Sequence, residues 1–164
     1  MAPAEVQLVR VDESNALEYK EIRLAMLLDS PRSFAMTHAQ ELLKTDDEWR
    51  ARTRTSSTWM AVVDGTRAGA ATMYVAPELP EGEALLVAMW VDPAFRGRGV
   101  GDALIGRVVE EARAQGIRRL HLDVVTDNAP AVRLYERLGF APTDRVVRRE
   151  DDPCTAELRM VRDL

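Results

Sequence analysis

A glycine-rich segment between an apolar run and an amphipathic stretch carries the clearest chemical signal in the sequence. It reads Arg96-Gly97-Arg98-Gly99-Val100-Gly101 and is followed by Asp102. The N-terminus of a helix presents unpaired N–H groups and a partial positive charge, and glycines let that backbone approach an anion closely. Arg96 and Arg98 add positive charge, so the segment predicts a phosphate or pyrophosphate site at the start of a helix.

Two common phosphate-binding motifs do not fit this segment. In a dinucleotide fingerprint that begins at Gly97, the third glycine would fall on Asp102. A Walker A loop ends in Lys followed by Ser or Thr, and residues 101–108 contain neither Lys nor a hydroxyl side chain. Both motifs are therefore excluded, while a glycine-rich turn that binds nothing remains an alternative on this segment alone.

A second motif follows about 30 residues later and supplies a family resemblance. It runs through Leu120-His121-Leu122-Asp123-Val124-Val125-Thr126-Asp127-Asn128-Ala129-Pro130-Ala131-Val132-Arg133-Leu134-Tyr135-Glu136-Arg137-Leu138-Gly139-Phe140. It resembles the strand, Asn, helix, Leu-Tyr and Gly-Phe signature of the GNAT superfamily of acyl-CoA N-acyltransferases. Arg96, Gly99 and Gly101 match that family's Arg/Gln-x-x-Gly-x-Gly/Ala motif. The clear resemblance covers about residues 84–140, and the N-terminal half agrees only in the order of its elements.

The resemblance implies acetyl-CoA as co-substrate, held in a V-shaped opening between two parallel strands. The main chain of Met89, Trp90 and Val91 would pair with the pantetheine arm like an added strand. The side chain of Asn128 would contact the same arm. The pyrophosphate would be held by the amides of the glycine segment, for which the cofactor residues are Arg96, Gly97, Arg98, Gly99, Val100, Gly101 and Asp102.

The resemblance also implies direct attack of a neutral amine on the thioester, in a ternary complex. The tetrahedral oxyanion needs a donor, for which a backbone N–H near Val91 is the candidate. Tyr135 is the candidate acid for the leaving thiolate, against the alternative of a tyrosine that only packs in the core. A base must accept the amine proton, and the candidates are Asp123, Glu83 or a chain of waters.

The acceptor is less defined than the cofactor. The resemblance implies that residues 34–36, Phe-Ala-Met, line the acceptor entrance, and ordinary core packing is the alternative. We expect a primary amine, either of a small molecule or of a peptide or protein N-terminus. A non-catalytic acyl-CoA-binding sensor or structural domain is the alternative function.

The hydrophobic periodicity predicts the elements that must position these residues. Helical spacing or helix-start signals predict helices at Ser14–Leu28, Thr45–Arg54, a segment that follows the glycine loop and ends at Gly116, and Asn128–Leu138. Residues 33–40 are expected to form a loop or an irregular helix. Apolar or alternating runs predict strands at Val6–Val11, Thr58–Val63, Ala68–Val75, Ala84–Val91, residues 120–124, Asp144–Arg149 and Thr155–Val161.

These elements predict an α/β fold built on a mixed sheet. The resemblance makes it GNAT-like, with about seven mostly antiparallel strands, an opening between the two central parallel strands and about four helices on both faces. The nearly continuous apolar character of Ala84–Val91 predicts a central strand that is buried on both faces. A chain of 164 residues is expected to form one domain, residues 1–164.

Composition limits the other functions. The net charge of −5 argues against a nucleic-acid partner. No apolar run approaches the roughly 18 residues of a membrane span, and residues 1–6 do not resemble a signal peptide, so we expect a cytoplasmic protein without a membrane partner. Cys154 is the single cysteine, and no spacing indicates a metal site. A homodimer, formed through the last hairpin, is a further expectation from the resemblance.

Overall fold

The computed structural model describes residues 5–164, so the first residues, on which the expected lack of a signal peptide partly rests, lie outside the described part. The strands are β1 (Val6–Arg10), β2 (Ser57–Val63), β3 (Thr66–Tyr74), β4 (Glu83–Val91), β5 (Arg119–Val125), β6 (Ala141–Arg148) and β7 (Ala156–Asp163). The α-helices are α1 (Ala16–Asp29), α2 (His38–Leu42), α3 (Asp46–Arg52), α4 (Val100–Ala114) and α5 (Ala129–Arg137). Two 3-10 turns, Pro31–Ser33 and Pro93–Phe95, precede α2 and α4.

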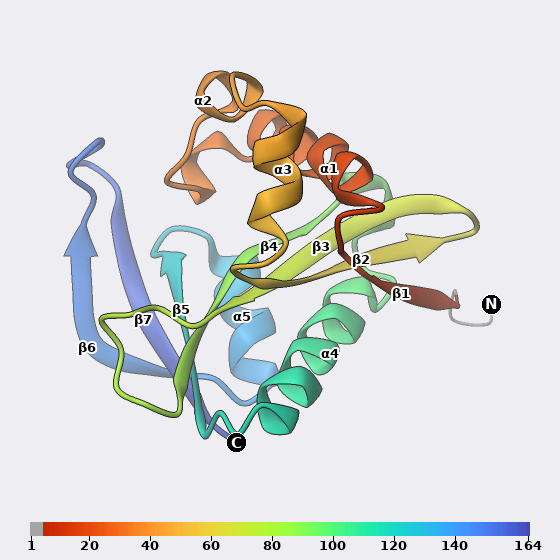
Figure 1. The fold of residues 1–164 in the computed structure, drawn as a ribbon. Coiled ribbons are helices and arrows are strands. Elements are labelled where there is room, and N and C mark those ends of the chain that lie inside the picture. The colour runs from red at the N-terminus through yellow and green to blue at the C-terminus, as the bar shows by residue number, and fades with distance from the viewer. Residues whose placement is uncertain (1–4) are drawn as a thin grey trace.

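The seven strands form one sheet in the order β1-β2-β3-β4-β5-β7-β6. All neighbours are antiparallel except β4 and β5, which are parallel and pair only from Glu83–Leu85 to Arg119–His121. Beyond that short ladder the two strands diverge (Figure 1). The predicted mixed sheet with an opening between its two central parallel strands is confirmed.

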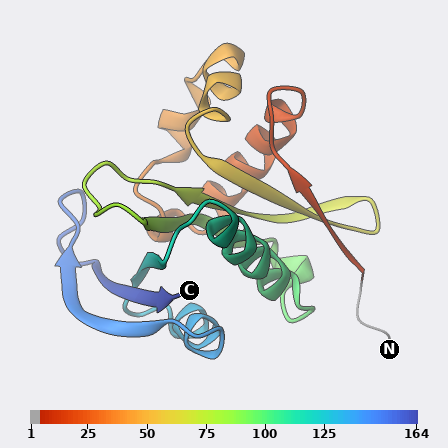
Figure 2. The ribbon, with the colours of Figure 1, turned by 60° about the horizontal axis from the view of Figure 1, so that its bottom comes forward.

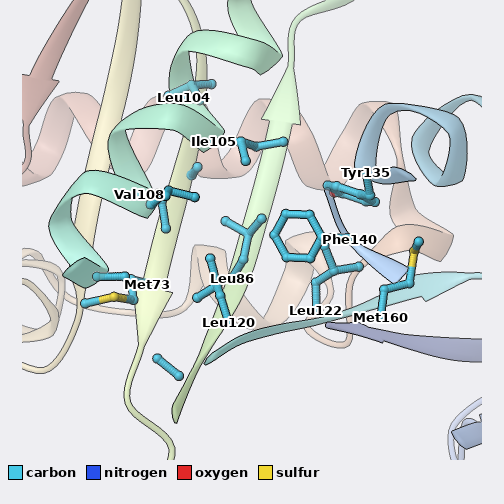
Figure 3. Close-up of a cluster of buried hydrophobic side chains, with 14 of the residues drawn as sticks. Met73, Leu86, Leu104, Ile105, Val108, Leu120, Leu122, Tyr135, Phe140 and Met160 are labelled. Carbon is cyan, nitrogen blue, oxygen red and sulfur yellow. The ribbon is translucent and has the colours of Figure 1, made fainter. Parts of the chain in front are cut away.

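Helices cover both faces of this sheet. One buried cluster contains side chains of α4 and α5 against β3, β4 and β5, and the other contains side chains of α1 and α3 against Met60, Ala70 and Trp90. Figure 2 shows α4 and α5 on the face opposite the three N-terminal helices. Figure 3 shows part of the first cluster, in which α4 side chains meet those of the central strands, with the labelled residues Leu86, Leu104, Ile105, Val108, Leu120, Leu122, Tyr135 and Phe140.

Capping boxes start two of the N-terminal helices. The predicted box at Thr45 is confirmed, because its side chain accepts from the N–H of Glu48 and the Glu48 side chain accepts from the N–H of Thr45. An equivalent box joins Thr37 and Gln40 at the start of α2. Part of the segment that was expected to be loop or irregular helix, residues 33–40, therefore belongs to a regular helix. The overlooked signal is Thr-x-x-Gln at residues 37–40.

Strand β4 contains a bulge that shapes the opening. Ala70 pairs with Trp90 but Thr72 pairs with Val87, so two residues of β4, Ala88 and Met89, face one residue of β3. Ala88 has a φ of 50°, which is rare for a residue with a side chain. The prediction that this strand is buried on both faces is wrong for residues 87–89, which are half-buried because they line a cleft.

Candidate active site

A cleft of about 840 Å³ runs through the opening between β4 and β5. That volume lies toward the upper end of the range for small-molecule and cofactor sites. The cleft is lined by most of the residues that the sequence pointed to: Met89, Trp90, Val91, Arg96, Gly97, Gly99, Val100, Gly101, Asp102, Asp123, Asn128 and Tyr135. Arg98 and Glu83 are the two predicted residues that do not line it.

The glycine segment forms a turn that exposes the start of α4 to the cleft. Gly97 and Gly99 have φ values of 75° and 81°, which an L side chain adopts only with strain, and a Cβ atom on either would meet nothing within 4 Å. The first N–H of α4 with a helical partner is that of Ala103, which donates to the carbonyl of Gly99. The amides before Ala103 thus have no carbonyl partner within the helix, and the turn fits a pyrophosphate.

Asp102 places a negative charge in this first turn, and Arg137 of α5 compensates it. Two hydrogen bonds of 2.7 and 2.9 Å join the guanidinium to the two carboxylate oxygens. Hydrogen bonding from Arg137 lowers the pKa of Asp102, so the carboxylate stays ionised and paired. The positive end of α4 therefore remains available to an anion.

Arg96 serves the loop in a way that the sequence did not reveal. Its Nε donates to the carbonyl of Val91 at 2.9 Å and its Nη2 donates to Asp29 Oδ2 at 2.6 Å. The same Asp29 oxygen accepts from Nε1 of Trp90 at 2.9 Å. The carboxylate at the end of α1 thus ties the end of β4 to the glycine loop. Arg98 lies apart from this network, with its guanidinium 5.6 Å from the ring centroid of Phe95.

The edge of β4 that faces β5 has no strand partner after Leu85 within residues 5–164. Its backbone groups are thus available to an extended ligand, as the prediction for Met89, Trp90 and Val91 requires. The exception is the carbonyl of Val91, which accepts a hydrogen bond from Arg96. Across the opening, the Oδ1 atom of Asn128 caps α5 by accepting from the N–H of Ala131 at 3.3 Å. That bond leaves the Nδ2 amide of Asn128 free to donate into the cleft.

Tyr135 lies on α5 with its ring edge-on to Phe140, at a centroid distance of 5.9 Å. Figure 3 shows Tyr135 beside the ring of Phe140, which lies among the other buried side chains. Only 9% of Tyr135 is exposed, and burial raises the pKa of its hydroxyl to about 12. The group is therefore a neutral phenol that retains its proton to donate. Tyr135 thus packs in the core and also lines the cleft, and its role as the acid stays a prediction.

The two candidate bases lie in different places. Asp123 lines the cleft and forms an ion pair with Arg159 of β7, its partner across the strand pair. Glu83 lies at the closed end of the opening, beside a smaller pocket, with Nε2 of His121 3.4 Å away and Arg119 3.6 Å away. Asp123, but not Glu83, therefore lines the same cleft as Tyr135.

The other end of the cleft is lined by residues 33–36, which include the predicted Phe34, Ala35 and Met36. Arg149 of the β6–β7 hairpin anchors this segment, because it donates hydrogen bonds to the carbonyls of Arg32 and Phe34 at 2.6 and 2.8 Å. Arg23 and Arg52 also line this end. Sequence reasoning missed both, and the available signal for Arg23 was a charged residue among the apolar positions of α1.

Other site types are not indicated in the part of the chain that the structure describes. No group of three or more His, Cys, Asp or Glu side chains is placed to hold a metal ion there. None of the helices in residues 5–164 combines the length and apolar character needed to cross a membrane. The cleft thus remains the principal candidate site.

Known proteins resemble this chain in sequence and in fold. Residues 23–140 match the Acetyltransferase (GNAT) family. A mycothiol acetyltransferase from Beutenbergia cavernae is 36% identical over 124 residues, which are 72% of this chain and 41% of that protein. The [ribosomal protein bS18]-alanine N-acetyltransferase of Escherichia coli is 33% identical over 90 residues, which are 55% of this chain and 60% of that protein. This chain therefore matches less than two thirds of the length of either relative.

A solved structure extends the likeness to the whole fold. The GNAT-family acetyltransferase from Streptococcus pneumoniae has a TM-score of 0.83 and 21% identity, and the match covers 98% of this chain and all of that chain. At this identity the likeness concerns the fold alone. The family match, in contrast, spans the glycine segment, the diverging strands and the helix of Tyr135. This chain belongs to the GNAT family of acetyltransferases.

Proposed function

We propose that this chain is an N-acetyltransferase that moves the acetyl group of acetyl-CoA to a primary amine of a small molecule or of a peptide or protein N-terminus. The observation that carries the proposal is the arrangement along one cleft. The free amides of α4 lie in the turn after β4, the unpaired edge of β4 follows, and the buried phenol of Tyr135 lies across the opening. This arrangement suits a long, extended ligand with an anionic end and a reactive end.

The proposed reaction is direct attack of the neutral amine on the thioester carbonyl, with both substrates bound. The attack forms the C–N bond, and collapse of the tetrahedral species breaks the C–S bond and releases CoA. A backbone N–H of the bulged stretch near Val91 is the proposed donor to the oxyanion. Tyr135 is the proposed acid for the thiolate, since burial keeps its hydroxyl protonated.

For the base we propose Asp123, acting through water. Arg159 donates one hydrogen bond to each carboxylate oxygen of Asp123. Each oxygen retains a second lone pair that can accept a proton or a hydrogen bond from water. Glu83 is the alternative base and would need a longer chain of waters, because it does not line the large cleft. A cytoplasmic location and a homodimer through the β6–β7 hairpin stay predictions from the sequence.

The experiment that tests the function follows free CoA and acetylated product, by chromatography, for a panel of primary amines with acetyl-CoA. Product formed in equal amount to CoA supports the proposal. Stabilisation of the protein by acetyl-CoA without turnover on any amine would instead favour a non-catalytic acyl-CoA-binding domain. Absence of both turnover and stabilisation would contradict both functions.

A further inference from the structure

A buried ionic cluster joins the three N-terminal helices near residues 33–36, at the end of the cleft that we propose admits the acceptor. At its centre is Glu41 of α2, whose side chain is 0% exposed. Its Oε1 lies 3.2 Å from Arg23 Nε and 2.9 Å from Arg52 Nη1, and its Oε2 lies 2.7 Å from Lys44 Nζ. One carboxylate thus faces three cations, and the cluster carries an excess of two positive charges.

Glu41 keeps its negative charge at ordinary pH, so the excess of two positive charges persists. Burial by itself raises the pKa of Glu41, but hydrogen bonds from Lys44 and Arg52 and the charges of Arg52 and Arg23 lower it to about 2. Glu41 is therefore ionised at every pH at which the protein would work. The excess positive charge comes from Arg23, Arg52 and Lys44, which outnumber the one carboxylate.

Both arginines of the cluster line the cleft, and each donates one hydrogen bond to Glu41, which leaves other N–H donors on both guanidinium groups. The side chain of Arg23 is 6% exposed, and its Nη1 contacts Met26 Sδ at 3.3 Å. Within residues 5–164, its Nε and Nη1 make these two contacts, which leaves donor capacity on the guanidinium. The guanidinium also lies 5.3 Å from the ring centroid of Phe34, on the acceptor wall. A nearly buried cation with an unused donor therefore borders the space that the acceptor must enter.

Among residues 5–164, the acidic side chains that line the cleft already have partners of their own. The two acidic side chains that line the cleft each form an ion pair with an arginine, Asp102 with Arg137 and Asp123 with Arg159, and Asp29 pairs with Arg96 beside it. A cationic wall repels an ammonium group and attracts an anion. Guanidinium groups bind planar oxyanions especially well, because their N–H groups match two oxygens at once.

We infer that the acceptor amine carries an oxyanion, a carboxylate or a phosphate, that is bound by Arg23 and Arg52. The inference rests on the proposed acetyltransferase function and narrows its substrate class. The anionic group anchors the acceptor against α1 and α3, while the amine extends toward the diverging strands. The positive wall also favours the neutral, nucleophilic form of the amine over its ammonium form.

The first test is a binding measurement that needs no turnover. The CoA-loaded protein is melted with ω-amino acids of increasing length, from glycine to 6-aminohexanoate, each beside its own carboxamide and the diamine of matching length. O-Phosphoethanolamine is compared with ethanolamine in the same way, to test for binding of a phosphate. We expect at least one acid to raise the melting temperature while its amide and diamine do not. Equal shifts for acid, amide and diamine at every length, or no shift by any oxyanion, would overturn the inference.

Substitutions test whether the arginines around Glu41 cause the preference for an oxyanion. Arg52→Gln removes a cation whose side chain is 30% exposed, and Glu41 keeps Arg23 and Lys44. Arg50→Gln is the matched control, because Arg50 lies on the same helix, pairs with Asp47 and does not line the cleft. We expect Arg52→Gln to weaken binding of the preferred acid about tenfold or more without changing the affinity for CoA. Arg52→Lys should recover part of the loss, and Arg50→Gln should have no effect.

The kinetic test uses the same pairs with acetyl-CoA. We expect the ratio of kcat/KM for acid over amide to exceed about ten in the native protein and to approach one in Arg52→Gln. An equal loss for acid and amide in Arg52→Gln would mean that the cluster is structural and would overturn the inference. Faster turnover of amides or diamines than of acids would also overturn the inference, but it would support the acetyltransferase function. If no amine is acetylated, the function fails, and the binding comparison still decides the inference.

Discussion

Both carboxylate oxygens of Asp123 accept hydrogen bonds from Arg159, at 2.6 and 2.8 Å. The two residues face each other in the register of β5 and β7, so the pair joins the wall of the cleft to the C-terminal hairpin. A bidentate pair holds its carboxylate in one orientation. Asp123 is therefore fixed in place before any substrate arrives, with its remaining lone pairs available to water.

The choice between the two candidate bases is testable by paired substitutions. Asp123→Asn keeps the shape of the side chain but removes its ability to accept a proton, so we expect kcat/KM to fall at least about tenfold. Glu83→Gln should change kcat/KM less than twofold, since Glu83 lies outside the large cleft. The measurement is kcat/KM against pH for both variants. A larger loss in Glu83→Gln would transfer the role to Glu83, and small losses in both would favour a chain of waters.

The glycine turn predicts a selective loss of cofactor binding. Glutamate at position 99 would place an anion at the free amides of α4, so Gly99→Glu should abolish the rise in melting temperature caused by acetyl-CoA. The φ of 81° at Gly99 will also lower the stability of the ligand-free variant by about 1–2 kcal/mol.

Gly106→Glu is the matched control, because Gly106 is an exposed position of the same helix and does not line the cleft. Glutamate is a better helix former than glycine, so this variant should be at least as stable as the native protein and keep the full response to acetyl-CoA. Equal responses of the two variants would show that the pyrophosphate is bound elsewhere.

Tyr135 should affect chemistry more than binding. Tyr135→Phe keeps the buried ring beside Phe140 but removes the proposed proton donor, so we expect kcat to fall about 100-fold with little change in the KM for acetyl-CoA. Tyr19→Phe is the control, since Tyr19 is buried in the other cluster against Trp49 and does not line the cleft. Unchanged turnover in Tyr135→Phe would mean that the thiolate leaves without this acid.

The ionic cluster predicts a defined acid sensitivity. The pKa of Glu41 is lowered from 4.5 to about 2 in the folded chain. The stability that this shift contributes, ~3 kcal/mol at most, is fully present above pH 4.5 and is lost as the pH falls from 4.5 towards 2. Unfolding by urea across this range should therefore depend less on pH in Glu41→Gln than in the native protein. Glu110→Gln, which removes an exposed partner of Arg107, should keep the native dependence; identical pH dependence in both variants would contradict this assignment.

Local signals in the sequence predicted the features that depend on few neighbouring residues. The capping box at Thr45, the glycine turn before α4 and the alternating strands each follow from backbone and side-chain chemistry within a short segment. The cofactor end of the cleft is built mainly from two such segments, residues 96–102 and 128–135, and the structure places both at the cleft. The Thr37–Gln40 box was equally local and was overlooked.

The features that the sequence did not reveal depend on residues that are distant in the chain. The pairs Asp29–Arg96 and Asp123–Arg159 join residues 67 and 36 positions apart, and no spacing rule links such positions. The bulge at Ala88 depends on its register with β3. The cluster around Glu41 requires α1, α2 and α3 to pack together, so its charge excess became visible only in three dimensions.

The central claim is that acetyl transfer to an amine occurs in the cleft between β4 and β5. Its most direct test is the appearance of acetylated amine and free CoA, quantified together by chromatography and mass spectrometry, with native protein and Tyr135→Phe compared at equal concentration. We predict equal amounts of the two products from the native protein and about 100-fold slower formation of both by the variant. Formation of acetylated amine at the same rate by both proteins, or no acetylated amine from any primary amine, would contradict the claim.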